Sequence, residues 1–358
     1  MPSLKEIKGR INSISSTLAI TSAMKMVAAA KLQKAQMAIQ NMLPYERRLH
    51  SMLIDLMGAM NISAAASEDG SVRGSGSAER GFDQSGDRLS LSNRHDLAGM
   101  DGAYSLMAQR EVRKVAIVAF ASNSSLCGAF NSNAIREATA VINEYRASGL
   151  GDADITVYSV GRKMAEAMKK LGFPSPADFT KMSDSPSYDA ASALAQELFD
   201  GFVSGRFDKV ELVYNHYKST SSQPTTRQTY LPLSLADATA DLQAGKIADS
   251  ASEFDTNRGA ETVGAPVVRQ GSPTTEDLIV EPSKEALIAI LLPKVIRLRI
   301  FTTLLDSAAA EHAARTVAMQ LATDNGNDLL QELTLEYNKG RQQKITSEIL
   351  DLVGGSMQ

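Results

Sequence analysis

The first sixty residues carry a regular apolar repeat. Its steps of three and four residues alternate without a slip, which is the 3.5-residue period of a left-handed coiled coil. Only Thr21, Lys25 and Glu46 break the apolar rule, and Pro44 is the one place where a local bend is expected. The pattern predicts one long N-terminal helix. Its positions are Leu4, Ile7, Ile11, Ile14, Leu18, Thr21, Lys25, Ala28, Leu32, Ala35, Ile39, Met42, Glu46, Leu49, Leu53, Leu56 and Met60.

A weaker stripe of the same kind occupies the C-terminal part of the chain. It follows Ser283, a candidate N-cap, and is weakened by polar interruptions and by Gly326 and Gly340. A helix of about 60–70 residues is about 90–100 Å long. Two such helices at opposite chain ends predict an antiparallel pair. The apolar positions are Leu287, Leu291, Leu298, Phe301, Leu305, Ala308, Met319, Ala322, Leu329, Leu333, Ile345, Ile349 and Leu352.

Between these helices, apolar runs alternate with helical spacing. Val115–Phe120 is continuously apolar, as in a strand buried on both faces, and Asn131–Arg146 has the spacing of a helix. Further strands are predicted at Ile155–Val160, Val210–Tyr214 and Thr226–Leu231, with helices between them. Such alternation predicts a mainly parallel sheet with helices on its faces. The fold class is therefore α/β, with a long antiparallel coiled coil and a central Rossmann-like domain.

These patterns divide the chain into five parts. Residues 1–60 form the N-terminal coiled-coil helix and 111–235 the central α/β domain. Residues 61–110 and 236–277 are polar insertions, because they are rich in Gly, Ser and isolated charges without sustained periodicity. Residues 278–358 hold a last strand and the C-terminal coiled-coil helix.

Composition excludes several classes of protein. A net charge of −4 argues against nucleic acid as a bulk electrostatic partner. No apolar stretch approaches the roughly 20 residues of a membrane span, and the N-terminus lacks the apolar core of a targeting peptide. One cysteine, Cys127, precludes an internal disulfide and fits a reducing compartment.

Motifs for chemistry are missing from the sequence. There is no phosphate loop and no GxGxxG after a strand, and Gly161-Arg162-Lys163 is better explained as a turn into a helix than as an anion site. The four histidines, His50, His95, His216 and His312, lack metal-ligand spacing. No cofactor and no metal are therefore expected.

Cys127 follows the first buried strand, where reactive groups often lie. A nucleophilic cysteine needs a base or a positive field, and no His or Lys is near it in the sequence. We therefore favour a packed small hydrophobic side chain over a nucleophile.

One segment of the N-terminal helix is apolar on every side. Ala19, Ile20 and Ala23 begin it, and it continues from Met26 to Ala30. A helix apolar all round must be covered on more than its partner's side. Small and flexible residues there favour a close sleeve without fixed hydrogen bonds, and the alternative is that the central domain packs over this stretch.

Long sequence stretches at both ends and at the first strand resemble the gamma subunit of F-type ATP synthases. They are LKEIKGRI from Leu4, ITSAMKMVAAAKL from Ile20, SSLCGAFN from Ser124, AAEHAARTVAMQLATDNGNDLL from Ala309 and ELTLEYNKGRQQKITSEILDLVGG from Glu332.

The resemblance implies a rotating shaft that couples proton translocation to ATP synthesis or hydrolysis and holds no active site of its own. The implied partners are the hexamer of alternating alpha and beta subunits, the epsilon subunit and the membrane c-ring, with delta, a and b subunits in the same complex. The chemistry belongs to beta. The implied location is peripheral, at the cytoplasmic face of the bacterial plasma membrane.

Three contact zones follow from the resemblance. Two of them meet the hexamer, and the third is the α/β domain, a foot that is expected to bind the epsilon subunit and the polar loops of the c-ring. An apolar collar is expected to hold the C-terminal tip. Moving beta loops are expected to meet the shaft lower down, where Lys25 pairs with an acidic loop. The alternative for Lys25 is a lysine that is simply solvated. The residues are Met24, Lys25 and Met26, then Gln320, Thr323 and Asp324, and at the tip Ile349, Leu352 and Val353.

Two other interpretations compete with a shaft. A structural tether that dimerises through the coiled coil explains the heptads but leaves the all-round apolar segment unexplained. A nucleotide-binding α/β enzyme with helical extensions is disfavoured by the missing phosphate loop.

Overall fold

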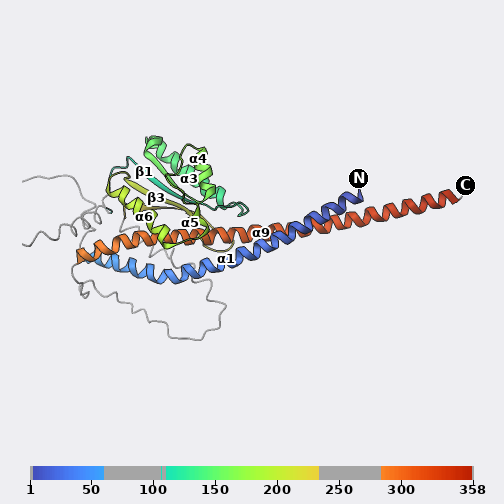
Figure 1. Ribbon diagram of the computed structural model, residues 1–358, viewed down its shortest axis with the longest axis horizontal. Helices are drawn as coiled ribbons and strands as arrows, with labels where there is room; N and C mark the ends of the chain where they lie inside the picture. The colour runs from blue at the N-terminus through green and yellow to red at the C-terminus, as the bar shows by residue number, and fades with distance from the viewer. Residues whose placement is uncertain (1–2, 60–105, 107–109, 234–283, 357–358) are drawn as a thin grey trace, which may run out of the picture.

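The computed structural model describes residues 3–59, 106, 110–233 and 284–356. Two long helices, α1 (Leu4–Ala59) and α9 (Lys284–Ser356), lie side by side in opposite directions and form a rod. The α/β domain sits beside one end of this rod, and the two chain termini lie near the other end (Figure 1). The predicted coiled coil and central domain are confirmed. Both polar insertions, apart from Leu106 and Arg110, and the strand expected just after residue 277 fall outside the described residues.

The heptad series of α1 is the buried seam of the rod. Every predicted position up to Leu56 is buried or half-buried, including the three polar exceptions, while Met60 lies outside the described residues. Glu46 is buried and accepts a hydrogen bond from Thr302 Oγ1 at 3.2 Å. The helix continues through Pro44, which is exposed.

The seam of α9 differs from the predicted stripe. Ala322 and Leu329 are exposed, although they were predicted to face the partner helix. Most of the residues that are buried or half-buried in this part instead follow a heptad through a threonine and two glycines, which an apolar count does not recognise. They are Met319, Thr323, Gly326, Leu330, Leu333, Tyr337 and Gly340.

Three contacts fix the register of the two seams. A Cβ at Gly340 would lie 3.0 Å from Leu4 Cδ2, and one at Gly326 would lie 2.6 Å from Leu18 Cδ2. The Thr323 hydroxyl donates to Thr21 Oγ1 at 3.1 Å. By this register α9 extends 16 residues past Leu4, from 341 to 356, or about 24 Å. Ile345, Ile349 and Leu352 of the predicted stripe lie in this extension and are exposed, because no α1 residue remains to cover them.

The central domain is a four-stranded sheet in the order β2-β1-β3-β4. The strands are β1 (Val115–Phe120), β2 (Ile155–Val160), β3 (Lys209–Asn215) and β4 (Thr225–Leu231). β1 pairs in parallel with both β2 and β3, and β4 is antiparallel to β3. The predicted strands and the mainly parallel sheet are confirmed, and β1 is buried along its whole length as its continuous apolar run indicated.

Helices cover both faces of the sheet. α3 (Phe130–Ala147) and α4 (Arg162–Lys170) cover one face, and the short η3 (Asp152–Asp154) leads into β2. α6 (Tyr188–Val203) and α9 cover the other face, with α5 (Thr180–Asp184) beside them. α9 is therefore both one helix of the coiled coil and part of one helical layer of the α/β domain.

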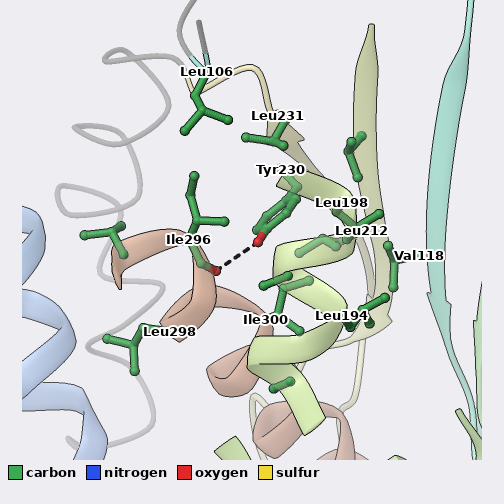
Figure 2. Packing of buried hydrophobic residues seen from close by; sticks show 14 of the residues in the cluster. Leu106, Val118, Leu194, Leu198, Leu212, Tyr230, Leu231, Ile296, Leu298 and Ile300 are labelled. Atoms are coloured by element: carbon green, nitrogen blue, oxygen red, sulfur yellow. Dashed lines mark hydrogen bonds between the residues drawn. The ribbon is translucent and has the colours of Figure 1, made fainter. Parts of the chain in front are cut away.

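Polar contacts fasten the domain to α9. Figure 2 shows the buried Tyr230 hydroxyl, which donates to the Ile296 carbonyl at 2.9 Å among packed leucines and isoleucines. Further along α9, Asp306 accepts from the Tyr217 backbone N–H at 2.9 Å and lies 2.6 Å from His216 Nδ1. If α9 rotated relative to the domain, these contacts would break and the apolar core around them would open.

A buried ion network holds β3, β4 and α3 together on the face away from the rod. The Glu211 carboxylate accepts from the Tyr145 hydroxyl at 2.6 Å and is paired with Lys209 and Arg227, each at 2.7 Å. Burial raises the pKa of Glu211, but the hydrogen bonds from Arg227, Lys209 and Tyr145 outweigh it and hold this pKa below its usual value.

Glu211→Gln is expected to destabilise the chain by about 2–4 kcal/mol, because it removes the buried carboxylate that pairs with two half-buried cations. Glu144→Gln is the matched control: Glu144 pairs with the same Arg227 but is solvent-exposed, so its loss should cost about 0–1 kcal/mol. Urea unfolding of the full chain measures both. Because the folded pKa of Glu211 is lowered, its contribution is present above pH 4.5 and is lost as the pH falls through the folded value. Equal losses for the two variants would contradict this assignment.

Candidate partner-binding surface of the coiled coil

A belt of exposed apolar side chains crosses both helices of the rod, next to the β1 loop of the α/β domain. On α1, Ile20, Met26 and Val27 are 57–64% exposed, and the neighbouring alanines of the all-round apolar segment are exposed except for Ala28. The register places Val317 and Leu321 of α9 at the same height, and both are also exposed. The alternative that the central domain covers this stretch is therefore wrong. Exposed apolar surface gathered in this way is typical of a site that binds another protein.

The belt is short of groups that could fix a partner at one angle. Its exposed alanines, together with Ile20, Met26, Val27, Val317 and Leu321, have apolar side chains without hydrogen-bonding atoms of their own. Contacts of this kind are non-directional, because burial of apolar area does not depend on the orientation of the partner. The surface therefore suits a partner that moves around the rod.

The predicted contact residues fall into two groups in space. Thr323, whose hydroxyl bonds Thr21, is half-buried in the seam, as are Met24, Lys25 and Gln320 at nearby heights. Met26 and Asp324 are exposed, and the Asp324 carboxylate accepts from Gln320 Nε2 at 2.7 Å.

The other group is the end of α9. Ile349, Leu352 and Val353 are all exposed, with Leu352 at 75%. Figure 1 shows this end extending beyond the start of α1, well away from the α/β domain. Six of the nine residues thus lie at the belt, and three lie on the part of α9 that extends past Leu4, the first residue of α1.

The loops at the carboxyl ends of β1 and β3 are closed by the rod. Cys127 and Phe130 after β1 and Tyr217 after β3 share one apolar cluster with residues of both long helices. Open α/β sheets bind their ligands at this edge, next to the point where the strand order reverses. Here that position is filled by Leu32, Ala309, Ala310 and Ala313.

Cys127 is buried in this cluster, as expected for a packed small side chain. Its Sγ accepts from Asn131 Nδ2 at 3.2 Å and lies 3.9 Å from the Ser124 carbonyl. These partners are neutral, so they supply neither the base nor the positive field that a nucleophilic thiolate needs. Within the described parts of the chain, no three of the His, Cys, Asp and Glu side chains gather as a metal site would require.

Charged groups link the β1 loop to α9 at the height of Ala29, at one edge of the belt. Arg315 pairs with the buried Glu311 at 2.7 Å and donates to Ser124 Oγ at 2.7 Å. Burial raises the pKa of Glu311 in spite of this pairing. His312 lies beside them, and burial, together with the charges of Arg315 and Lys31, lowers its pKa to about 4.

Sequence reasoning missed the α9 half of the belt. Val317 and Leu321 are apolar residues that alternate with the seam, and only the register of the two helices shows that they share a height with Met26 and Val27. The sequence did carry a signal for them: both are apolar residues at helix positions that do not face the partner helix.

The lowered pKa of His312 leads us to expect a smaller free energy of unfolding on mild acidification. Its folded pKa of about 4 lies below the unfolded value of 6.5, so the folded state resists protonation. The stabilisation is complete above pH 6.5, declines as the pH falls and is gone below pH 4, with a total of up to about 3 kcal/mol. Denaturant unfolding of wild type and His312→Gln between pH 7 and 4 measures it. The variant retains Glu311, whose raised pKa acts in the opposite direction, so the difference between the two curves isolates the histidine. Parallel curves would refute the assignment.

Comparisons with known proteins agree with this architecture. A family described as ATP synthase matches residues 3–357. The chain is 47% identical to the ATP synthase gamma chain of Phocaeicola vulgatus and 45% identical to that of Bacteroides thetaiotaomicron, with 100% of each chain covered. A chain in a structure of the Euglena gracilis mitochondrial ATP synthase (OSCP/F1/c-ring, rotational state 3) shares the fold, with a TM-score of 0.52 and 19% identity over 99% of this chain and 93% of that chain. This chain belongs to the ATP synthase gamma-chain family.

Proposed function

We propose that the chain is the central rotor shaft of an F-type ATP synthase, which couples proton translocation to ATP synthesis and hydrolysis by rotation. The observation that carries this proposal is the exposed apolar belt on a two-helix rod, in a member of the gamma-chain family. The belt is exposed in the chain alone, so we expect a separate protein to cover it.

The belt and the tip are proposed to contact the hexamer of alternating alpha and beta subunits. Met24, Lys25 and Met26, with Gln320, Thr323 and Asp324, meet moving beta loops, and Lys25 pairs with an acidic group there. Ile349, Leu352 and Val353 sit in an apolar collar, which their exposure in the chain alone supports. A beta site changes from 1:99 to 99:1 between two states only if the shaft binds them with a difference of about 5.5 kcal/mol. Many weak contacts along the rod supply this difference.

The α/β domain is proposed to be the foot that binds the epsilon subunit and the polar loops of the membrane c-ring, in a complex that also holds delta, a and b subunits. The contacts of Tyr230 and Tyr217 with α9 support this role, because they fasten the domain to the helix that reaches the tip. No helix among the described residues has the length and apolarity of a membrane span. We place the chain at the cytoplasmic face of a bacterial plasma membrane, held there by its partners.

The chain itself is proposed to be non-catalytic. The edge of the sheet at which α/β enzymes bind ligands is filled by its own coiled coil, which supports this view. Catalysis then belongs to the beta subunits, and this chain changes their state by contact alone.

A pull-down from native membranes tests the proposal. A tagged copy of the chain is expected to co-purify with alpha, beta and epsilon subunits at one copy per complex, because a single shaft turns in each hexamer. Light scattering on the purified chain provides the control, since a structural tether would form a well-defined homodimer. A homodimer that brings down none of these subunits would reject the shaft.

Met24→Lys is expected to lower the number of protons pumped per ATP hydrolysed. A second cation next to Lys25 adds a further directional charge contact to a mainly apolar surface. A contact of about 0.5–1 kcal/mol corresponds to a change of about twofold or more. ATP-driven acidification of membrane vesicles, divided by their hydrolysis rate, measures this ratio. Met37→Lys is the matched control, as Met37 is an exposed methionine of the same helix outside the belt. Normal pumping by Met24→Lys would count against the assigned zone.

A further inference from the structure

Two glycines of α9 form notches for two leucines of α1. At Gly326, an added Cβ would lie 2.6 Å from Leu18 Cδ2, closer than such atoms pack, and 3.2 Å from its Cγ, so the leucine side chain would have to move. At Gly340, the corresponding distance to Leu4 Cδ2 is 3.0 Å. Glycine is unfavourable in the interior of a helix, so two glycines in this seam need an explanation from packing. The close approach of the leucines is that reason.

The spacing of the notches matches the spacing of the leucines. Gly326 and Gly340 are 14 residues apart, as are Leu4 and Leu18, and 14 residues are two heptads. Midway between the notches, the same register places the buried Leu333 opposite Ile11. On α9, a large side chain (Leu333) therefore lies between two notches. On α1, all three residues opposite them are large: Leu4, Ile11 and Leu18.

This alternation opposes a slip of the two helices. A shift by one heptad would preserve the general apolar pattern, as it does in any regular coiled coil. In this chain the shift would place Leu18 against Leu333 and leave Gly326 without its leucine. One site would then be overpacked and the other would hold a void, and both changes are unfavourable.

The correct register also assembles the belt. Its α1 half, with Ile20, Met26 and Val27, and its α9 half, with Val317 and Leu321, share a height only in the observed pairing. A slip of one heptad moves the halves apart by about 10 Å along the rod.

We propose that Gly326 and Gly340 are positioning residues that lock the register of the rod and thereby align the two halves of its partner-binding belt. The proposal rests on the rotor function in so far as it concerns coupling, but the register itself is a property of the full chain. The two parts are therefore tested by separate measurements.

A disulfide reporter reads the register in the purified full chain. Thr21→Cys and Thr323→Cys replace two side chains whose hydroxyls are 3.1 Å apart, so the pair is expected to cross-link on oxidation. The background is Cys127→Ser, which removes the one native cysteine. Gly326→Leu is expected to lower the cross-link yield by about threefold or more, because the added side chain fills the notch.

Two further variants make this result specific. Gly9→Leu introduces the same side chain at a glycine of the rod that has no atom within 4 Å of an added Cβ, and it should leave the yield unchanged. Leu18→Ala combined with Gly326→Leu moves the bulk from one helix to the other and should restore the yield. Gly326→Ala is a milder wedge, for use if Gly326→Leu fails to fold, and should lower the yield in the same direction. Equal yields for a Gly326 wedge and Gly9→Leu would overturn the proposed lock.

The assembled complex tests the consequence for coupling. Protons pumped per ATP should fall about twofold or more with Gly326→Leu, remain normal with Gly9→Leu and recover with the Leu18→Ala combination. A lost cross-link together with normal pumping would overturn the link between register and coupling. If the purified complex did not contain the wild-type chain, the rotor function would be rejected. The cross-linking result would still decide whether the notches set the register.

Discussion

The pairing of α1 with α9 is the interaction on which the other features of the molecule depend. The seam brings together the two ends of the chain, and other faces of α9 complete the core of the α/β domain. One helix therefore belongs to two packed units at once. Its contacts through Tyr230 and Asp306 prevent the domain from turning independently of the rod. Any force applied to the domain reaches the far end of α9 through an unbroken helical backbone.

Much of this architecture could be predicted because its signals are local. The α1 heptads, the fully buried β1 and the alternation of strands and helices all follow from side-chain spacing within single elements. The α9 seam was harder to predict, since Thr323, Gly326 and Gly340 are not apolar residues and only their fit to α1 shows their role. The Glu211 network likewise joins Tyr145 and Arg227, which are distant in sequence and meet only once the sheet and α3 have formed.

The candidate surface was predictable in part for the same reason. Its α1 half was visible as a helix with apolar residues on every side, and the bare tip followed from the greater length of the C-terminal helix. The α9 half depends on which residues of the two helices share a height, and that is a property of the pair. The closure of the sheet's carboxyl edge by Leu32 and the alanines of α9 depends equally on tertiary packing. It explains physically why an α/β domain of this kind carries no ligand motif at that edge.

The rod changes from two helices to one at Gly340, and this has a mechanical consequence. The bending stiffness of a beam rises steeply with its width, so a single helix is far more compliant than a packed pair. Residues 341–356 of α9 are therefore the compliant end of a stiffer rod. A sideways force on this end bends the single helix before it bends the paired part.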